Sequence, residues 1–302
     1  MTTPQTPAAG LPGLLGELEW SGILHASTPG LAERLATDRL IAAYIGFDPT
    51  ASSLHVGHLI PIFGLIRLQR RGGRPVALVG GGTGLIGDPS FRSADRPMLS
   101  LDDARANADA IHIQLERFLD FTPGPTGAVM ANNLDWLGKM SMIEYLRDIG
   151  KHFTVPYMLA KDSVQVRLEK GLSFTEFSYM TLQAIDFQHL YRNFGVEMQM
   201  GGADQWGNIT AGLELIRRSA AAADAGEAVA HGISYKLLLA PSGAKFGKSE
   251  AGESVWLDPA RTTPFAFYQY WLNADDRDVA TYMRWFTLWG PDEVAALDEA
   301  IG

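Results

Sequence analysis

Short apolar runs that alternate with helical segments are the feature of this sequence that most restricts its fold. The run 75–80 (PVALVG) is apolar throughout, which is typical of a strand buried on both faces of a parallel sheet. Strands are predicted at residues 38–47, 75–80, 128–132, 196–200 and 233–239. Helices are predicted at residues 14–35, 55–71, 101–121, 141–149, 173–194 and 209–222. This alternation predicts an α/β fold with a doubly wound, mainly parallel sheet.

The order of these segments divides the 302 residues into one large domain and an appendage. After Asp258 only helices are predicted, at residues 264–272, 277–286 and 291–301. We interpret them as the start of a small helical domain. The predicted parts are a disordered lead at 1–13, the α/β domain at 14–232, a strand and loop at 233–258, and the start of the helical domain at 259–302.

Composition excludes several classes of protein. The chain has no cysteine, so it cannot form a disulfide or a thiolate metal site. It has neither a run of 18 apolar residues nor a cationic start followed by an apolar stretch. We therefore expect a cytoplasmic protein without a membrane span. The net charge of −9 argues against binding nucleic acid through overall electrostatics. The basic stretch 67–74 is explained as cations near the end of a helix.

The motif HVGH, from His55 to His58, opens a predicted helix directly after a strand. Ser52 or Ser53 is the expected N-cap. The start of a helix offers N–H donors and the positive end of a dipole to an anion. The two imidazoles add donors at the same place, and Gly57 leaves room for a bound group to approach the backbone. The alternative is a capped helix with two incidental surface histidines.

Polar clusters follow the predicted strands, where ligands bind in open α/β sheets. They lie at residues 44–58, 80–90, 201–208 and 245–249. The second contains the pattern GxGxxG, from Gly82 to Gly87, which is typical of dinucleotide sites when a helix follows at once. Two nearby prolines argue against such a helix and against a nicotinamide enzyme. Asp88 is either a turn carboxylate or a partner for a cationic ligand group.

The helix predicted at 173–194 carries a polar stripe. Tyr179, Gln183 and Asp186 are spaced four and three residues apart, so they share one face. Most other positions are apolar, which predicts a buried helix. The stripe therefore faces either an internal hydrogen-bond network or a ligand. A hydroxyl, an amide and a carboxylate in an apolar wall would suit a small molecule that carries both charges.

The segment KFGKS places Lys245 and Lys248 three residues apart in a polar, glycine-containing loop. Two lysines on such a loop can close on a triphosphate. The alternative is a solvated surface loop.

Taken together and in this order, the motifs resemble the catalytic part of the bacterial-type tyrosyl-tRNA synthetases, which are class I aminoacyl-tRNA synthetases. The resemblance rests on YIGFDPTASSLHVGH, GGTGLIGDPS, NNLDWLG, GKHFTVPYMLAKDSVQVRL, SFTEFSYMTLQAIDF, GGADQWGNITAGLELIRR, KFGKSE and FYQYWLNADDRDV. It implies a Rossmann-like catalytic domain with a connective and dimerisation insertion around residues 122–190, and a homodimer with its interface near 133–166. It also implies that most of the tRNA-reading region is absent, so we expect tyrosine activation with weak tRNA charging.

The resemblance implies a two-step reaction. Tyrosine reacts with Mg-ATP to give tyrosyl-adenylate and pyrophosphate, and the tyrosyl group then passes to the terminal ribose of its tRNA. No metal held tightly by the protein itself is expected. The implied catalytic residues are Thr50, His55, His58, Lys245 and Lys248. The implied tyrosine-binding residues are Tyr44 and Asp186 at the phenol, Asp88, Tyr179 and Gln183 at the ammonium group, and Gln205. The implied ATP-binding residues are Gly46, Asp48, Gly57, Gly202, Asp204, Leu237, Leu238 and Lys248.

Some residues depart from the familiar pattern of this family. KFGKS replaces the general class I form KMSKS, Phe91 and Arg92 stand where Gly-Lys is more familiar, and Pro61 is expected to bend the HVGH helix. Three other functions compete: a tryptophanyl-tRNA synthetase, a non-catalytic RNA-binding scaffold, and another adenylyltransferase with an HxGH helix. The pair Tyr44 and Asp186 opposes the first, and the complete phosphate-binding set opposes the second. The polar stripe on the long helix opposes the third.

Overall fold

The computed structural model describes residues 13–37, 39–88, 100–168, 171–223, 226–237 and 254–301. Six strands form one sheet in the order β1-β6-β5-β2-β3-β4. They are β1 (Leu24–Ser27), β2 (Ala42–Phe47), β3 (Arg74–Val79), β4 (Val129–Asn132), β5 (Val196–Gly202) and β6 (His231–Tyr235). All neighbouring pairs are parallel except β1 with β6. The predicted doubly wound, mainly parallel sheet is therefore confirmed.

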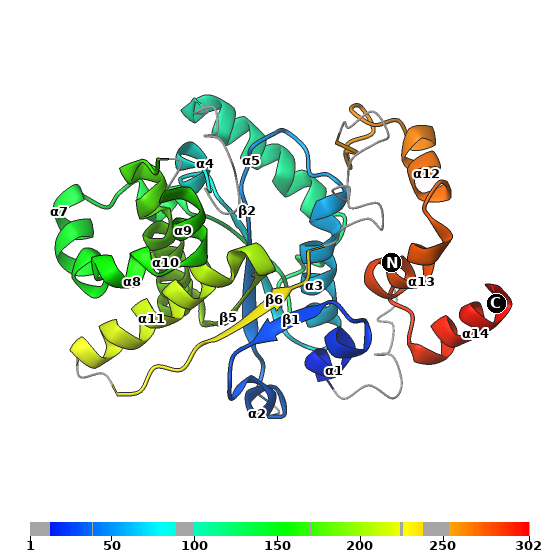
Figure 1. Ribbon diagram of the computed structural model, residues 1–302, viewed down its shortest axis with the longest axis horizontal. Helices are drawn as coiled ribbons and strands as arrows, with labels where there is room; N and C mark the ends of the chain where they lie inside the picture. Colours follow the sequence, from blue (N-terminus) through cyan, green and yellow to red (C-terminus); the bar gives the residue numbers. More distant parts are fainter. Residues whose placement is uncertain are drawn as a thin grey trace.

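Helices cover both faces of the sheet (Figure 1). On one side lie α1 (Gly13–Trp20), α3 (Leu59–Arg70) and α5 (Leu101–Leu115); on the other lie α10 (Phe174–Phe194) and α11 (Trp206–Ala222). The central strand β2 explains this arrangement, because its side chains alternate between the faces. Ala43, Ile45 and Phe47 join the core with α3, whereas Ala42 and Tyr44 join the core with α10. Tyr44 thus points toward the helix that carries the polar stripe.

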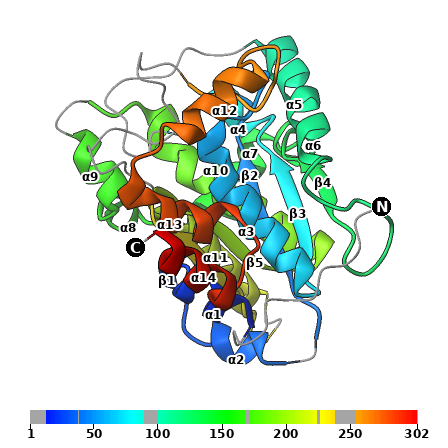
Figure 2. The same cartoon turned by 90° about the vertical axis from the view of Figure 1, so that its right-hand side faces the viewer.

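Short helices connect the larger elements. They are α2 (Leu31–Leu35), η1 (Val56–His58), α4 (Thr83–Ile86), α6 (Leu134–Leu137), α7 (Met142–Glu144), η2 (Tyr145–Ile149), η3 (Gly150–His152), α8 (Val155–Leu159), α9 (Asp162–Leu168) and η4 (Ala203–Gln205). The helices α12 (Pro264–Leu272), α13 (Asp276–Phe286) and α14 (Pro291–Ile301) follow the sheet. Figure 2 shows these three in a row alongside α3. In the described part of the chain, no helix has the length and apolarity needed to cross a membrane.

The long helix α10 forms where the sequence predicts it. Ser173 is its N-cap and accepts a hydrogen bond from the Glu176 N–H, and the Glu176 carboxylate accepts one from the Ser173 N–H. Gly195 ends the helix at a φ of +67°, a conformation that glycine adopts without strain. Both ends of α10 are therefore set by local sequence.

The prediction of one helix over 14–35 was wrong. This segment contains α1, β1 and α2, because Gly22 and Gly30 adopt positive φ angles of 72° and 78° and interrupt the helix. Other predicted elements have different limits: β2 starts at Ala42, α5 ends at Leu115, and β6 spans His231–Tyr235. Of the predicted disordered lead only Gly13 is described, and it begins α1. The KFGKS segment lies outside the described residues.

Candidate functional site

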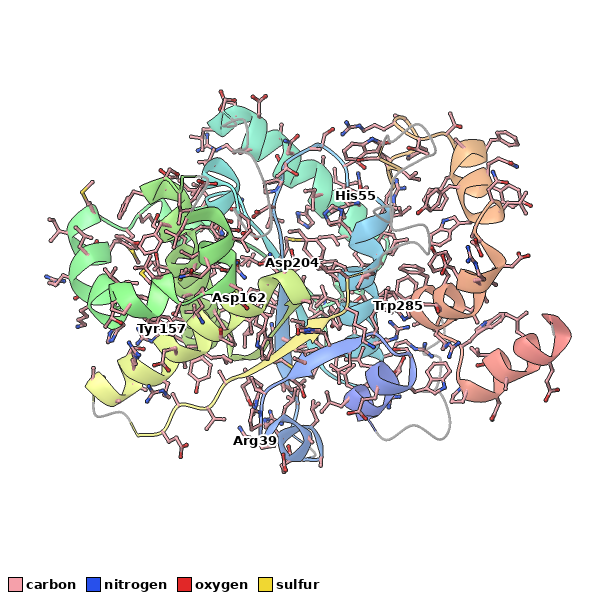
Figure 3. The ribbon with its side chains drawn as sticks, in the orientation of Figure 1. Arg39, His55, Tyr157, Asp162, Asp204 and Trp285 are labelled. Atoms are coloured by element: carbon pink, nitrogen blue, oxygen red, sulfur yellow. The ribbon has the colours of Figure 1, made fainter. Side chains whose placement is uncertain are left out.

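A cavity of about 480 Å³ opens at the carboxyl ends of β2 and β5, beside the start of α3. Most of the predicted site residues that the structure describes line this cavity. These are Tyr44, Gly46, Asp48, Gly57, His58, Asp88, Tyr179, Gln183, Asp186, Gly202, Asp204, Gln205 and Leu237. Figure 3 shows Asp204 near the end of the sheet and His55 at the start of the α3 helix. Residues distant in sequence therefore meet at the edge where ligands of open α/β sheets bind.

The two histidines of HVGH cap the start of their own helix. The Nδ1 atom of His55 accepts a hydrogen bond from the Gly57 N–H at 3.1 Å, and the Nδ1 atom of His58 accepts one from the His55 N–H at 3.0 Å. In each neutral ring the proton must then lie on Nε2. The expected N-cap, Ser52 or Ser53, was wrong: Ser53 instead donates to the Leu54 carbonyl.

His58 is a neutral donor at the wall of the cavity. Burial lowers its pKa to about 3, and the neighbouring His55 ring, with its centroid 4.0 Å away, adds to this effect. The ring therefore stays uncharged at physiological pH. Gly57 has a simpler role than expected, because a Cβ atom there would approach the His55 ring to 2.8 Å. The glycine makes room for the imidazole as well as for a ligand.

Tyr44 and Asp186 lie deep in the cavity and are 1% and 2% exposed. The Asp186 carboxylate accepts hydrogen bonds from Asn133 Nδ2 at 2.9 Å and from Trp136 Nε1 at 2.8 Å. Burial nevertheless raises its pKa to about 8. The Tyr44 hydroxyl is buried without a hydrogen-bond partner among the described residues. A buried polar group of this kind costs free energy that a ligand hydroxyl can recover.

A second carboxylate, Asp48, organises the middle of the cavity. Its oxygens accept hydrogen bonds from Thr83 Oγ1 at 3.0 Å and from the Tyr179 hydroxyl at 3.2 Å. Gly80 makes room for Asp48, since a Cβ atom at Gly80 would lie 2.2 Å from the carboxylate. Asp48 thus holds Tyr179 in place, a role the sequence did not reveal.

Two further carboxylates, Asp88 and Asp204, line the cavity. Gln205 Nε2 donates to Asp88 at 2.6 Å and, more weakly, to Asp204 at 3.3 Å. Burial raises the pKa of Asp204, and the nearby charge of Asp88 adds to this effect. With Asp48 and Asp186, four carboxyl groups line one cavity. The ionised carboxylates attract cations, and an anionic ligand can meet donors at His58 and Lys236.

Several residues of the site were not among the predicted ones, including Thr83, which donates to Asp48. Asn133, which is fully buried, donates to Thr83 and Asp186 and accepts from the Gly82 N–H at 2.7 Å. Trp136 follows it on α6, and Gln199 lies beside Tyr44 on the neighbouring strand. Asn133 and Trp136 lie in the stretch NNLDW, which is a polar cluster at the end of a strand. This pattern was the sequence signal that could have identified them.

Two predicted site residues, Thr50 and His55, do not line the cavity. Thr50 is exposed, and the His55 ring lies beside that of His58, with centroids 4.0 Å apart. The predicted residues Leu238, Lys245 and Lys248 lie outside the described residues, as do Phe91 and Arg92. Among the residues described, no group of three or more His, Asp or Glu side chains could hold a metal ion.

The GxGxxG pattern contains one helical turn, α4, which ends at Gly87 with a φ of 84°. Residues 87 and 88 are not helical, and both prolines that argue against a following helix lie outside the described residues. Another local prediction was wrong. Pro61 does not interrupt a helix interior. Because α3 begins only at Leu59, Pro61 lies in the first turn, where a missing N–H is tolerated.

Comparison with known proteins identifies this arrangement. Residues 36–302 match the family model of class I tRNA synthetases (W and Y). The chain is 52% identical to the tyrosine–tRNA ligase of Roseiflexus castenholzii over 95% of its length and 66% of that protein. It is 50% identical to the tyrosine–tRNA ligase of Geobacillus stearothermophilus, over 95% and 68%. The chain thus spans about two thirds of the length of the curated relatives it matches.

Solved structures agree. A C-terminally truncated mitochondrial tyrosyl-tRNA synthetase of Coccidioides posadasii matches with a TM-score of 0.81 and 30% identity, over 95% of this chain and 82% of that one. The tryptophanyl-tRNA synthetase of Plasmodium falciparum shares the fold, with a TM-score of 0.62 and 16% identity, over 94% and 75%. The chain therefore belongs to the class I tRNA synthetase family, in its bacterial-type tyrosyl branch.

Proposed function

We propose that this protein activates L-tyrosine with Mg-ATP and transfers the tyrosyl group to tRNA. The observation that carries the proposal is that the Tyr44 hydroxyl and the Asp186 carboxylate are both buried in the wall of one acidic cavity. A phenolic hydroxyl placed between them can accept a hydrogen bond from Tyr44 and donate one to Asp186. This single group would satisfy both buried residues.

The same geometry disfavours two close competitors of tyrosine. Phenylalanine has no hydroxyl and would leave both Tyr44 and Asp186 unpaired in a dry pocket. An indole N–H can donate to Asp186 but cannot accept a hydrogen bond from Tyr44. Asp88 suits the α-ammonium group of an amino acid, with Tyr179 and Gln183 on the face of α10, while Asp48 and Asp204 stay assigned to ATP.

The phosphate groups of ATP are assigned to the other end of the cavity. There the Nε2–H of His58 and the start of the α3 helix offer donors to anionic oxygens. Leu237 lines the cavity, and the Val56 N–H donates to the Val255 carbonyl at 2.9 Å. The chain between these two anchors carries Lys245 and Lys248, which lie outside the described residues. Their proposed contact with the leaving pyrophosphate rests on the KFGKS motif and on membership of the family.

The proposed chemistry needs charge stabilisation and no base. In the first step a carboxylate oxygen of tyrosine attacks the α-phosphorus, and the bond from that phosphorus to the bridging oxygen breaks. Pyrophosphate leaves with Mg²⁺, which enters as part of the substrate. In the second step a ribose hydroxyl of the tRNA attacks the tyrosyl carbonyl, the bond from the carbonyl carbon to the phosphate oxygen breaks, and the hydroxyl proton passes to the phosphate of the leaving AMP. Because the attacking carboxylate is already ionised, positioning and neutral donors such as His58 suffice.

Tyrosine binding is expected to depend on pH through Asp186. In the empty cavity its pKa is about 8, so at pH 6 and 7 the carboxyl group is mostly protonated. A phenol that donates to Asp186 favours the ionised form, so binding lowers this pKa and releases a proton. The affinity for tyrosine should therefore rise as the pH increases from 6 to 8, by up to roughly tenfold per unit. Calorimetric titrations in buffers of different ionisation enthalpy measure this release. An affinity and a proton count that stay constant would contradict the proposed contact.

Direct binding measurements test the choice of substrate. We expect equilibrium dialysis to detect tyrosine binding, with phenylalanine and tryptophan bound at least a hundredfold more weakly, about 2.7 kcal/mol or more. After addition of Mg-ATP, tyrosyl-adenylate should remain with the protein on gel filtration. Equal affinity for tryptophan would exclude the tyrosine assignment. Tight binding without any adenylate would favour a non-catalytic protein.

A homodimer is proposed from the surface of the insertion. Large apolar side chains are exposed along α7, α8 and the start of α10: Met142 (76%), Ile143 (67%), Val155 (59%) and Phe174 (73%). Exposed apolar residues gathered in this way are typical of protein–protein interfaces. Sedimentation equilibrium should give a dimer for the wild type and a monomer for Ile143→Asp. The control Ile113→Asp, at a site 60% exposed on α5, should remain dimeric. A monomeric wild type would refute the dimer.

With tRNA as partner, the cytoplasm is the expected compartment.

A further inference from the structure

Arg67 is buried at a contact between three helices. It lies in α3 and is 2% exposed. Burial lowers the pKa of its guanidinium, and the Glu17 carboxylate opposes this shift. A buried charge is costly unless it is hydrogen-bonded on several sides. The contacts that offset this cost therefore indicate what the residue holds together.

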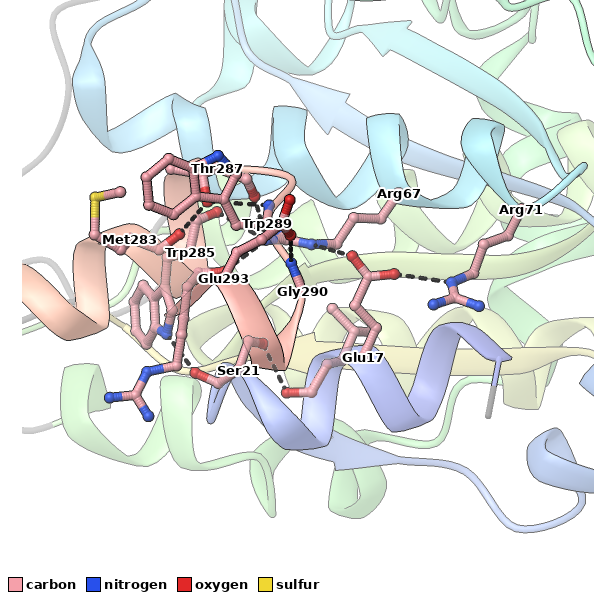
Figure 4. Close-up of polar contacts among 12 residues, drawn as sticks. Glu17, Ser21, Arg67, Arg71, Met283, Trp285, Thr287, Trp289, Gly290 and Glu293 are labelled. Carbon is pink, nitrogen blue, oxygen red and sulfur yellow. Dashed lines mark hydrogen bonds and ion pairs between the residues drawn. The ribbon is translucent and has the colours of Figure 1, made fainter. Parts of the chain in front are cut away.

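The guanidinium of Arg67 caps the end of α13. Its Nε donates to Glu17 of α1 at 2.9 Å. Its NH2 group donates to three carbonyls, those of Arg284 (2.7 Å), Trp285 (3.1 Å) and Thr287 (3.2 Å). Because α13 ends at Phe286, these carbonyls belong to its last turn and the residue beyond. Figure 4 shows Arg67 between Glu17 and this end of α13.

Packing reinforces the contact between α3 and α13. Trp285 is 5% exposed, and its indole N–H donates to the Ser21 carbonyl at the end of α1 at 2.9 Å. The rings of Phe63 in α3 and Phe286 in α13 meet edge to face, with centroids 6.2 Å apart. Helices α1, α3 and α13 thus form one unit around Arg67.

The other end of α3 is held by the chain that precedes α12. Leu54 accepts a hydrogen bond from the Leu257 N–H at 2.8 Å, which pairs the two backbones next to HVGH. Val56, Leu59 and Val255 form a small buried cluster against aromatic side chains of α12 and α13. Residues 254–287 therefore brace α3 at both ends.

We propose that Arg67 is a positioning residue for adenylate formation, which fixes α3 along its axis against α13 and so holds His58 at the phosphate end of the cavity. The proposal rests on the function proposed above. His58 lies nine residues before Arg67, about 13 Å along the helix, so the two do not touch. A stiff helix transmits an axial shift, and a misplacement of about 1 Å can cost up to a hundredfold in rate.

Two variants of Arg67 and one matched control test the proposal. Arg67→Met should lower the kcat of tyrosine-dependent pyrophosphate exchange about tenfold, while the Kd for tyrosine stays within twofold of the wild type. The kcat of Arg67→Lys should lie between those of the wild type and Arg67→Met, because an ammonium group can reach the carbonyls or Glu17 but not both. The control Arg71→Met also loses a contact with Glu17, of 2.8 Å, but Arg71 makes no hydrogen bond to α13 in the described chain. Its kcat should stay within twofold.

A double-mutant cycle distinguishes positioning from a general loss of structure. If Arg67 acts through His58, adding Arg67→Met to His58→Ala should lower kcat by less than threefold. The proposal would be overturned if Arg67→Met lowered kcat tenfold both in the wild type and in His58→Ala, or if it weakened tyrosine binding by the same factor as kcat. Either result would leave the proposed function intact. Circular dichroism and thermal unfolding check that the variants fold; if Arg67→Met does not, Arg67→Lys carries the cycle. A wild type without any exchange would refute the proposed function, and the role of Arg67 with it.

Discussion

Replacing His58 by alanine should slow the formation of tyrosyl-adenylate by roughly a hundred- to a thousandfold. The reason is that His58 supplies a fixed, neutral Nε2–H donor at the place assigned to the transferring phosphates, and the loss of one such donor typically costs this much in kcat. The hydrogen bond from the His55 N–H to Nδ1 holds the His58 ring in place, so the donor does not have to move during the reaction. The rate is measured by stopped-flow fluorescence or by pyrophosphate exchange at saturating substrates.

The same variant should bind tyrosine almost normally, because His58 is assigned to the phosphate end and Asp186 to the phenol end of the cavity. His112, which is half-buried on α5 and outside the cavity, provides the control: His112→Ala should leave both the rate and the binding unchanged. If His58→Ala instead weakened tyrosine binding more than tenfold, the assigned orientation of the substrates would be wrong. Since the pKa of His58 is about 3, its titration should not limit the rate between pH 5 and 8.

Replacing Asp186 by asparagine should remove most of the preference for tyrosine over phenylalanine. The carboxylate would form a charge-assisted hydrogen bond with the phenol, and losing it costs about 1.5–3 kcal/mol, or ten- to a hundredfold in kcat/KM for tyrosine. The kcat/KM for phenylalanine should change little. Rejection of a substrate that lacks one hydroxyl is a general consequence of buried polar groups, and this family is its standard example.

Tyr44→Phe is the companion variant and should separate recognition from stability. Because the Tyr44 hydroxyl has no partner in the described part of the empty protein, its removal should leave the melting temperature unchanged or raise it. Its affinity for tyrosine should fall about tenfold. Asp276→Asn, an exposed change on α13, is the control for Asp186→Asn. If Asp186→Asn and Tyr44→Phe both kept the preference for tyrosine over phenylalanine, another part of the protein would have to recognise the phenol.

The elements that could be predicted from sequence are those set by local signals. The limits of α10 follow from a capping box at Ser173 and a glycine at 195, and its polar stripe does line the cavity. The strand 75–80 is recognisable because a parallel strand buried on both faces is apolar throughout. The meeting of HVGH with the later clusters follows from a general rule about strand ends. These signals were enough to find the site.

The features that could not be predicted depend on pairing between distant segments. The strand β1 is a strand only because it pairs with β6, about 210 residues later, so its own sequence could pass for part of a helix. Asn133 becomes important only when the sheet brings the turn at Gly82 and the middle of α10 to it. The fit of Arg67 to α13 likewise follows from tertiary packing, whereas its sequence context suggested an ordinary cation near a helix end.

Exchange of labelled pyrophosphate into ATP tests the central claim most directly, because it reports adenylate formation without tRNA. The protein, Mg-ATP and one amino acid are incubated with labelled pyrophosphate, and the label in ATP is followed over time. We expect exchange with tyrosine, and exchange at background level with tryptophan, phenylalanine or no amino acid. Exchange supported equally by tryptophan, or no exchange by folded protein that binds tyrosine, would contradict the assignment of this cavity to tyrosine activation.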